Sequence, residues 1–169
     1  MATLVAKQQP TEIIYPDSDG KPMADNTLQA DAMTIIHNNL RALYADDPNV
    51  FVAIDLLWHP VEGNPRIRVA PDVLVALGRP KGHRGSYKQW EEGGVAPQVV
   101  FEVLSPGNRK AAMNEKRRFY AQYGVRSIMC TTLIRVCGRV GCVVGVGCCG
   151  CVRWRAGAVR CWGLSSGAG

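Results

Sequence analysis

The sequence predicts a mixed α/β domain in which helices flank a small sheet. Two apolar runs, residues 68–77 and 97–104, are short, bounded by proline or glycine and rich in β-branched residues, which is typical of buried strands. Two longer segments, near residues 26–44 and 108–123, have the spacing and composition of helices. Because strands and helices do not alternate regularly, an α/β or α+β sandwich around one sheet is favoured.

The N-terminal part of the chain predicts an extended lead-in followed by a helix. Residues 11–23 contain two prolines and a glycine, which interrupt regular structure. Asp25 or Asn26 can cap a helix that continues to about Tyr44. Its apolar residues, most of which fall on one face, are Leu28, Met33, Ile35, Ile36, Leu40 and Leu43.

Three strands and a second helix are predicted after this first helix. A turn at residues 46–49 leads into a strand at residues 50–58, which carries Asp55. The two apolar runs supply the next two strands, and residues 108–123 form a helix that stops at Gly124. A final strand is expected directly after this glycine.

Each apolar run carries one carboxylate, Asp72 in the first and Glu102 in the second. A carboxylate buried in a strand costs free energy unless something pairs with it, and a divalent metal ion is one such partner. Lys116, on the helix after the second run, can turn back toward the same sheet edge. The alternative is that Glu102 pairs with an ordinary cation and that Lys116 is a solvated helix charge. Asp55 is a weaker candidate for the same site.

The segment between the two carboxylate strands, residues 78–90, is basic and aromatic. It contains Arg79, Lys81, Arg84 and Lys88 together with Tyr87 and Trp90. Cations for phosphates and rings for base stacking are what a DNA-contacting loop requires, so these four cations are candidate nucleic-acid contacts. A solvated connecting loop is the alternative, because one basic loop is a weak footprint without a folded basic face.

The net charge of +6 belongs entirely to the C-terminal part of the chain. Residues 1–125 contain all 14 acidic residues and 14 of the 20 Lys and Arg, so this part is neutral. Residues 126–169 contain the six remaining arginines, all seven cysteines and half of the 18 glycines, but no Asp, Glu, Lys, His or Pro. This abrupt change divides the chain into a domain at residues 1–125 and a tail at residues 126–169 that we expect to be disordered.

We do not expect the cysteines of this tail to bind a metal ion. Paired C-x2-C motifs and histidines are absent from the tail, and the cysteine count is odd. Residues 1–10 lack the apolar core of a signal peptide, and no uninterrupted apolar run reaches membrane-spanning length. We therefore expect a cytoplasmic protein that has no membrane partner.

Four segments carry a family resemblance. They are I-I-Y-P-D-S-D-G-K-P-M, D-L-L-W-H-P-V-E-G-N-P-R-I-R-V-A-P-D-V-L-V, G-R-P-K-G-H-R-G-S-Y-K-Q-W-E-E-G-G-V-A-P-Q-V-V-F-E-V-L-S-P-G-N-R and N-E-K-R-R-F-Y-A-Q-Y-G-V. With this ordered set, residues 12–125 closely resemble the Uma-two family of bacterial endonucleases, which have the restriction-endonuclease-like PD-(D/E)XK fold. The resemblance implies hydrolysis of DNA phosphodiester bonds with Mg²⁺, or with Mn²⁺ in its place. DNA is the implied partner, and a homodimer is left open.

The resemblance also assigns roles to individual residues. Asp72 and Glu102 match the family's metal-holding acids, and Lys116 matches the lysine of its K-x-x-x-Y helix, which would assist the attacking water. In the usual (D/E)-x-K pattern the lysine lies two residues after the acid, where this chain has Leu104. The lysine function is therefore expected on the helix, at Lys116 or, as a fallback, at Lys110. Asp72, Glu102 and Lys116 are thus the candidate catalytic residues.

The resemblance ends abruptly after Val125, where the family continues into a Glu-Tyr-Tyr strand. Synonymous codons chosen for residues 126–134 give Glu-Tyr-Tyr-Val-Tyr-Asp-Pro-Asp when they are read out of register. We therefore predict that residues 126–169 are an out-of-frame translation, that the last strand of the core is missing or replaced, and that endonuclease activity is impaired. The alternative is a catalytically inactive nuclease-like fold that acts as a binding module, or a non-functional truncated product.

Sequencing the gene around codon 126 tests this prediction. A single-base insertion or deletion there should restore a frame that contains acidic codons, because the first 125 residues are rich in Asp and Glu and the tail has none. If no such change restores an acid-containing frame, the tail is a genuine Cys-rich segment and the prediction is wrong.

Overall fold

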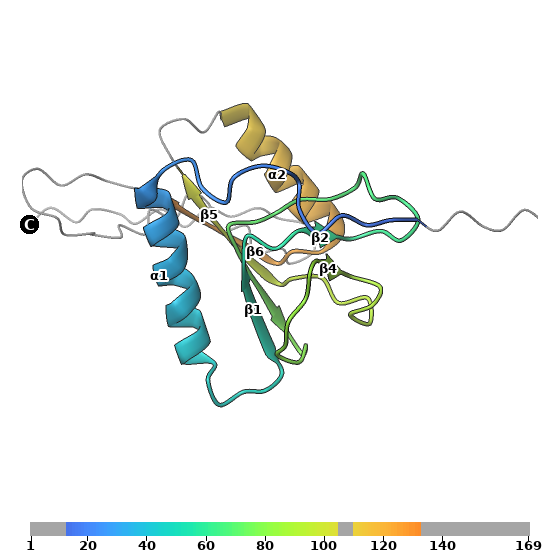
Figure 1. The fold of residues 1–169 in the computed structure, drawn as a ribbon, viewed down its shortest axis with the longest axis horizontal. Helices are drawn as coiled ribbons and strands as arrows, with labels where there is room; N and C mark the ends of the chain where they lie inside the picture. The colour runs from blue at the N-terminus through green and yellow to red at the C-terminus, as the bar shows by residue number, and fades with distance from the viewer. Residues whose placement is uncertain (1–12, 105–109, 133–169) are drawn as a thin grey trace, which may run out of the picture.

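The computed structural model describes residues 13–104 and 110–132, which form a mixed α/β unit (Figure 1). In this part of the chain the elements are α1 (Thr27–Leu43), β1 (Val50–Ile54), β2 (Trp58–His59), β3 (Val73–Leu77), β4 (Tyr87–Lys88), β5 (Val99–Leu104), α2 (Lys110–Tyr123) and β6 (Ser127–Thr132). The predicted fold class is confirmed. None of the described helices is long and apolar enough to cross a membrane.

Four strands form the main sheet, in the order β1-β3-β5-β6. β1, β3 and β5 are antiparallel neighbours, whereas β6 runs parallel to β5. A parallel neighbour requires a crossover connection, and α2 supplies this connection between β5 and β6. The short strands β2 and β4 pair with each other in a separate sheet.

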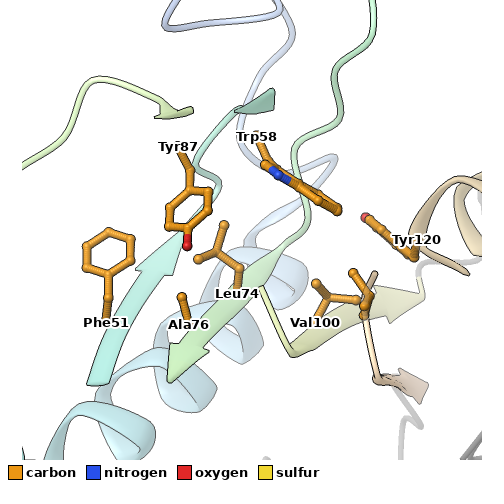
Figure 2. Close-up of a cluster of buried hydrophobic side chains, with 8 residues drawn as sticks. Phe51, Trp58, Leu74, Ala76, Tyr87, Val100 and Tyr120 are labelled. Atoms are coloured by element: carbon orange, nitrogen blue, oxygen red, sulfur yellow. The ribbon is translucent and has the colours of Figure 1, made fainter. Parts of the chain in front are cut away.

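Successive side chains of a strand point to opposite faces, so each face of the main sheet packs against its own set of elements. α1 covers one face, where Ala32 and Met33 pack with Val103 and Ile54. α2, β2 and β4 contribute to a core on the other face. This core consists of Phe51, Trp58, Leu74, Ala76, Tyr87, Val100, Tyr120 and Val125 (Figure 2).

Stacked aromatic rings join α2 to the small sheet and the small sheet to the main sheet. Trp58 stacks on Tyr120 with ring centroids 6.4 Å apart, and Phe51 stacks on Tyr87 at 6.0 Å. The Trp58 indole donates a hydrogen bond to Gln89 at 3.2 Å. Aromatic pairs of this kind contribute about 0.5–1.5 kcal/mol beyond the burial of their surface. The position of α2 over the sheet is therefore set by ring packing.

The predicted strand at residues 50–58 is divided into β1 and β2, so the prediction of a single strand was wrong. Asp55 lies between the two strands with a φ of 47°, the one positive φ of a non-glycine residue in the described part of the chain. Left-handed backbone turns the chain, and Trp58 and His59 then pair with β4 and not with the main sheet. Apolar composition alone does not reveal this turn.

A strand lies where the last strand of the core was expected. β6 pairs in parallel with β5 in register from Ser127 to Thr132. The sequence predicted that this strand is missing or replaced. A strand is present at this position, and its replacement by an out-of-frame segment stays a prediction. The structure also differs from the predicted division after residue 125, because β6 continues the sheet beyond it. Residues 133–169 of the predicted tail lie outside the described residues.

The end of α2 gives a test of the fold. Gly124 has a φ of 101°, and a Cβ added to it would lie 3.3 Å from the Cβ of Ala96. We expect Gly124→Ala to lower the free energy of unfolding by about 1–2 kcal/mol, because an L-residue is strained at this φ. Gly63→Ala is the matched control, since Gly63 has a φ of 85° but open space around an added Cβ. Urea unfolding should show the larger loss for Gly124→Ala, and an equal loss would exclude crowding against Ala96.

Candidate active site

Asp72 and Glu102 face each other at one end of the main sheet. β3 and β5 are antiparallel with Val73 opposite Phe101, so one further step places Asp72 opposite Glu102. Directly opposed side chains of neighbouring strands lie close together on one face of a sheet. The sheet therefore brings the two predicted carboxylates together.

Lys116 reaches the same place from α2. Its Nζ lies 2.7 Å from Glu102 Oε2 and 3.3 Å from the carbonyl oxygen of Ala70, two residues before Asp72. The Glu102 side chain is 3% exposed, whereas that of Lys116 is 33% exposed. The ammonium group thus has solvent on one side and a buried carboxylate on the other. The side chain of the fallback, Lys110, lies outside the described residues.

Tyr120 forms a hydrogen bond with the second carboxylate oxygen of Glu102. Its hydroxyl donates a hydrogen bond to Oε1, while Lys116 is bound to Oε2. Residues four apart lie on the same face of a helix, so Lys116 and Tyr120 reach down from α2 together. Burial raises the pKa of the Tyr120 phenol well above 10, and the Glu102 charge raises it further, so the hydroxyl keeps its proton and acts as donor.

Asp72 is held by the backbone of the neighbouring strand, β5. Its Oδ2 accepts a hydrogen bond from the Val103 backbone N–H at 2.5 Å. Gln29 of α1 is buried beside this group and donates through Nε2 to the Val103 carbonyl oxygen at 3.3 Å. The backbone N–H of Val103 therefore fixes the Asp72 carboxylate, and Gln29 holds the backbone of the same residue, Val103. Neither Gln29 nor Tyr120 was predicted as a site residue. Gln29 lies far from the site in the sequence, whereas Tyr120 is the tyrosine of the K-x-x-x-Y motif, which is the signal that could have found it.

Burial dominates the electrostatics of this cluster. It raises the pKa of both Asp72 and Glu102, and the Lys116 ammonium opposes the rise in each case. The charge of Asp72 also raises the pKa of Glu102. Among the described residues, one ammonium group thus opposes two carboxylates, and an added cation would relieve the repulsion between them.

Asp55 borders the same cluster. Its backbone N–H donates to the Asp72 carbonyl oxygen at 3.1 Å. Burial, followed by the charges of Asp19 and Asp72, raises the pKa of Asp55 to about 6, and Lys116 opposes this rise. The left-handed backbone of Asp55 is the kind of strain that gathers at functional sites. The structure therefore places the weaker sequence candidate beside the stronger ones.

The oxygen atoms of this cluster fit a divalent cation of the Mg²⁺ type. Such an ion prefers oxygen ligands, keeps several waters and is often held by only one or two carboxylates. Asp72 and Glu102 supply two carboxylates from the two inner strands of a rigid sheet. Within the described residues, no group of three or more His, Cys, Asp or Glu side chains is arranged to hold a metal ion. A site completed by water therefore suits these residues better than an all-protein cage.

The cations of the basic segment are not part of this cluster. Arg79 and Lys81 come after β3 at its far end, so the length of that strand, roughly 17 Å at about 3.4 Å per residue, separates them from Asp72. Arg79 and Arg84 both donate to Glu92, at 2.8 and 2.5 Å. The hydrogen bond from Arg84 is the largest cause of the lowered pKa of Glu92.

The other two cations also have internal partners. Lys81 donates to the carbonyl oxygens of Tyr44 and Ala45 just beyond α1, both at 2.7 Å. Lys88 lies 3.1 Å from Glu91 in an exposed pair. All four candidate nucleic-acid contacts thus bind other parts of the chain, and their contact with DNA stays a prediction.

Comparison with known proteins places this geometry in a family context. The family model Uma2, described as "Putative restriction endonuclease", matches residues 11–133. A crystal structure of a "putative nuclease" from Anabaena variabilis is similar, with a TM-score of 0.49 and 10% identity. The match covers 63% of this chain and 57% of that chain, so the similarity extends over little more than half of the solved protein. No curated protein matches the chain.

The raised pKa of Asp55 predicts a pH dependence of stability in buffer that contains EDTA. Between about pH 4 and about pH 6 the folded chain holds a proton that the unfolded chain has lost, so the free energy of unfolding should fall as pH rises through this window. Asp55→Asn should remove this part of the fall. Because Asp55 is partly exposed, the effect is on the order of 1 kcal/mol after screening.

The measurement is urea unfolding at several pH values for wild type, Asp55→Asn and the control Asp31→Asn. Asp31 is exposed on α1, so the control removes a negative charge away from the cluster. Parallel pH profiles for wild type and Asp55→Asn would contradict the prediction.

Proposed function

The chain belongs to the Uma2 family, whose model matches it from residue 11 to residue 133, and from this premise we propose that it is a Mg²⁺-dependent endonuclease that hydrolyses DNA phosphodiester bonds. The observation that supports the proposal best is the cluster of two opposed carboxylates and one lysine at the end of the main sheet. Carboxylates fixed on a sheet edge can hold a metal ion with positions left for water and phosphate.

Each residue of the cluster has a proposed role. Asp72 and Glu102 would hold Mg²⁺, or Mn²⁺ in its place. A bound divalent ion supplies Lewis-acid polarisation of the phosphate and a more acidic water. Lys116 Nζ, which is partly exposed beside Glu102, would orient the attacking water and balance charge on the phosphate as an ammonium group, while the proton of the water would pass to solvent.

DNA is the proposed substrate. Arg79, Lys81, Arg84 and Lys88 remain the proposed contacts to its phosphates, although each would have to share its present internal partner. The cost of that sharing is lowest for Lys88, whose pair with Glu91 is exposed. A cytoplasmic location and a homodimer stay predictions.

We further propose that the segment after Val125 impairs this activity. The sharp change of composition at residue 126 supports this view, as do the seven cysteines beyond it. An uncompensated cysteine-rich segment favours intermolecular oxidation and aggregation. The second candidate function, an inactive nuclease-like fold that binds without cleaving or has no function, rests on the same observation.

Metal binding and cleavage together test the proposed function. In the full chain, Mn²⁺ at 100 times its Kd should add about 2.7 kcal/mol to the free energy of unfolding and so raise Tm. Glu102→Gln should abolish the rise, and Asp72→Ala should slow plasmid nicking on the order of 100-fold or more. Glu62→Gln is the control, because Glu62 is an exposed acid outside the cluster.

Comparison with a chain in the restored reading frame separates the two candidates. Nicking by the restored chain and weak nicking by the present one would support an impaired nuclease. If well-folded protein of both forms fails to nick across several divalent metals, the inactive fold is correct. An equal Tm rise in wild type and Glu102→Gln would remove Glu102 from the metal site.

A further inference from the structure

We propose that Tyr120 is a positioning residue, which holds the Glu102 carboxylate in the orientation that a divalent cation requires. This inference rests on the proposed function and assigns a role to a side chain outside the set of predicted site residues. Tyr120 would touch neither the metal ion nor the DNA. Its hydroxyl would act through Glu102.

Both carboxylate oxygens of Glu102 accept hydrogen bonds from α2. Its two oxygens receive different donors, the Tyr120 hydroxyl on Oε1 and the Lys116 ammonium on Oε2. A carboxylate held at both oxygens cannot rotate about its terminal bond without losing a hydrogen bond. Since the residue is 2% exposed, water cannot replace the lost bond at low cost. The lone pairs left for a metal ion are therefore fixed in direction.

The Tyr120 side chain is held rigidly by burial and by ring packing. The residue is fully buried, and its ring is parallel to that of Trp58 within 11°. Phe119 packs edge-on against it, with an interplanar angle of 87°. Figure 2 shows the ring of Tyr120 pointing from α2 toward Trp58 in the core. A phenol clamped by its ring places its hydroxyl at one point, whereas the flexible Lys116 chain does not.

The two donors differ in role because they differ in exposure. Lys116 is 33% exposed and can move toward solvent or substrate, so its hold on Oε2 is exchangeable. Tyr120 has no such freedom. When a cation approaches Oε2 and the lysine shifts, the bond to Oε1 remains and preserves the direction of the carboxylate. Partners of metal ligands that act in this way typically change metal affinity about 10–100-fold when they are removed.

The simpler alternative is that the hydroxyl merely satisfies its own hydrogen bond in the core. Under this alternative Tyr120→Phe would change stability but would leave metal affinity unchanged. Tyr123 offers a matched control on the same helix. Its ring packs on Phe119 at 4.6 Å, and its hydroxyl accepts a hydrogen bond from Gln122 at 3.2 Å, whereas the hydroxyl of Tyr120 donates to Glu102.

The experiment titrates the full-length wild type, Tyr120→Phe and Tyr123→Phe with Mn²⁺ and follows the free ion by its EPR signal. We expect the half-saturating Mn²⁺ concentration to rise at least about 10-fold in Tyr120→Phe and to stay at the wild-type value in Tyr123→Phe. Equal values in wild type and Tyr120→Phe would overturn the positioning role alone. If wild type binds no Mn²⁺, the proposed function falls, and the positioning role falls with it.

A second measurement does not depend on the folding of Tyr120→Phe. In wild type labelled with ¹³C at tyrosine Cζ, saturating Mg²⁺ should shift the Tyr120 resonance, because the hydroxyl shares its acceptor with the ion. The Tyr123 resonance, identified by its loss in Tyr123→Phe, should remain in place. A Tyr120 resonance that does not move at saturating Mg²⁺ would also overturn the proposal.

Discussion

The buried carboxylate of Glu102 is the constraint on which the rest of the structure depends. A charged group at 2% exposure in an inner strand of the sheet must be compensated, and both of its compensating donors come from α2. The helix therefore cannot slide or rotate on the sheet without leaving this carboxylate unpaired. Ring packing of Tyr120 against Trp58 fixes the same register by independent means. The chain thus specifies the placement of α2 twice, once by charge and once by shape.

Two buried acids in this molecule illustrate the difference between a structural ion pair and a site. Glu92 receives two guanidinium groups, and their hydrogen bonds and charges lower its pKa. Glu102 shares one ammonium with Asp72, and burial raises the pKa of both acids. The charge of Glu92 is balanced by its two guanidinium groups. Among the described residues, Asp72 and Glu102 share a single ammonium group, so their negative charge is not fully balanced. Sites with perturbed carboxylates are places where a bound cation or a reaction can supply the missing charge.

Local sequence patterns predict part of the fold and part of the candidate site. β3 and β5 are apparent from their β-branched runs, and Asp72 and Glu102 stand out because acids are unusual in such runs. Lys116 was singled out by its place on the helix after the Glu102 strand, and the family resemblance then gave it a catalytic role, since exposed lysines on helices are the ordinary case. Local patterns do not reveal the contact of Gln29, which joins segments 74 residues apart. Tyr120 is the tyrosine of the K-x-x-x-Y motif, but its hydrogen bond to Glu102, 18 residues away, is apparent only in the fold. The internal pairing of the basic segment was hidden for the same reason.

The last strand shows why backbone pairing says little about the origin of a segment. A parallel ladder is made by main-chain groups, so many short β-prone sequences can occupy the same edge. Ser127–Thr132 contains Ile128 and two threonines, which suit a partly buried strand. The presence of β6 is therefore compatible with either reading frame of the DNA. Composition is the stronger argument for the predicted out-of-frame origin of residues 126–169. Selection on a folded domain would not be expected to leave every residue after Val125 without an acid or a lysine.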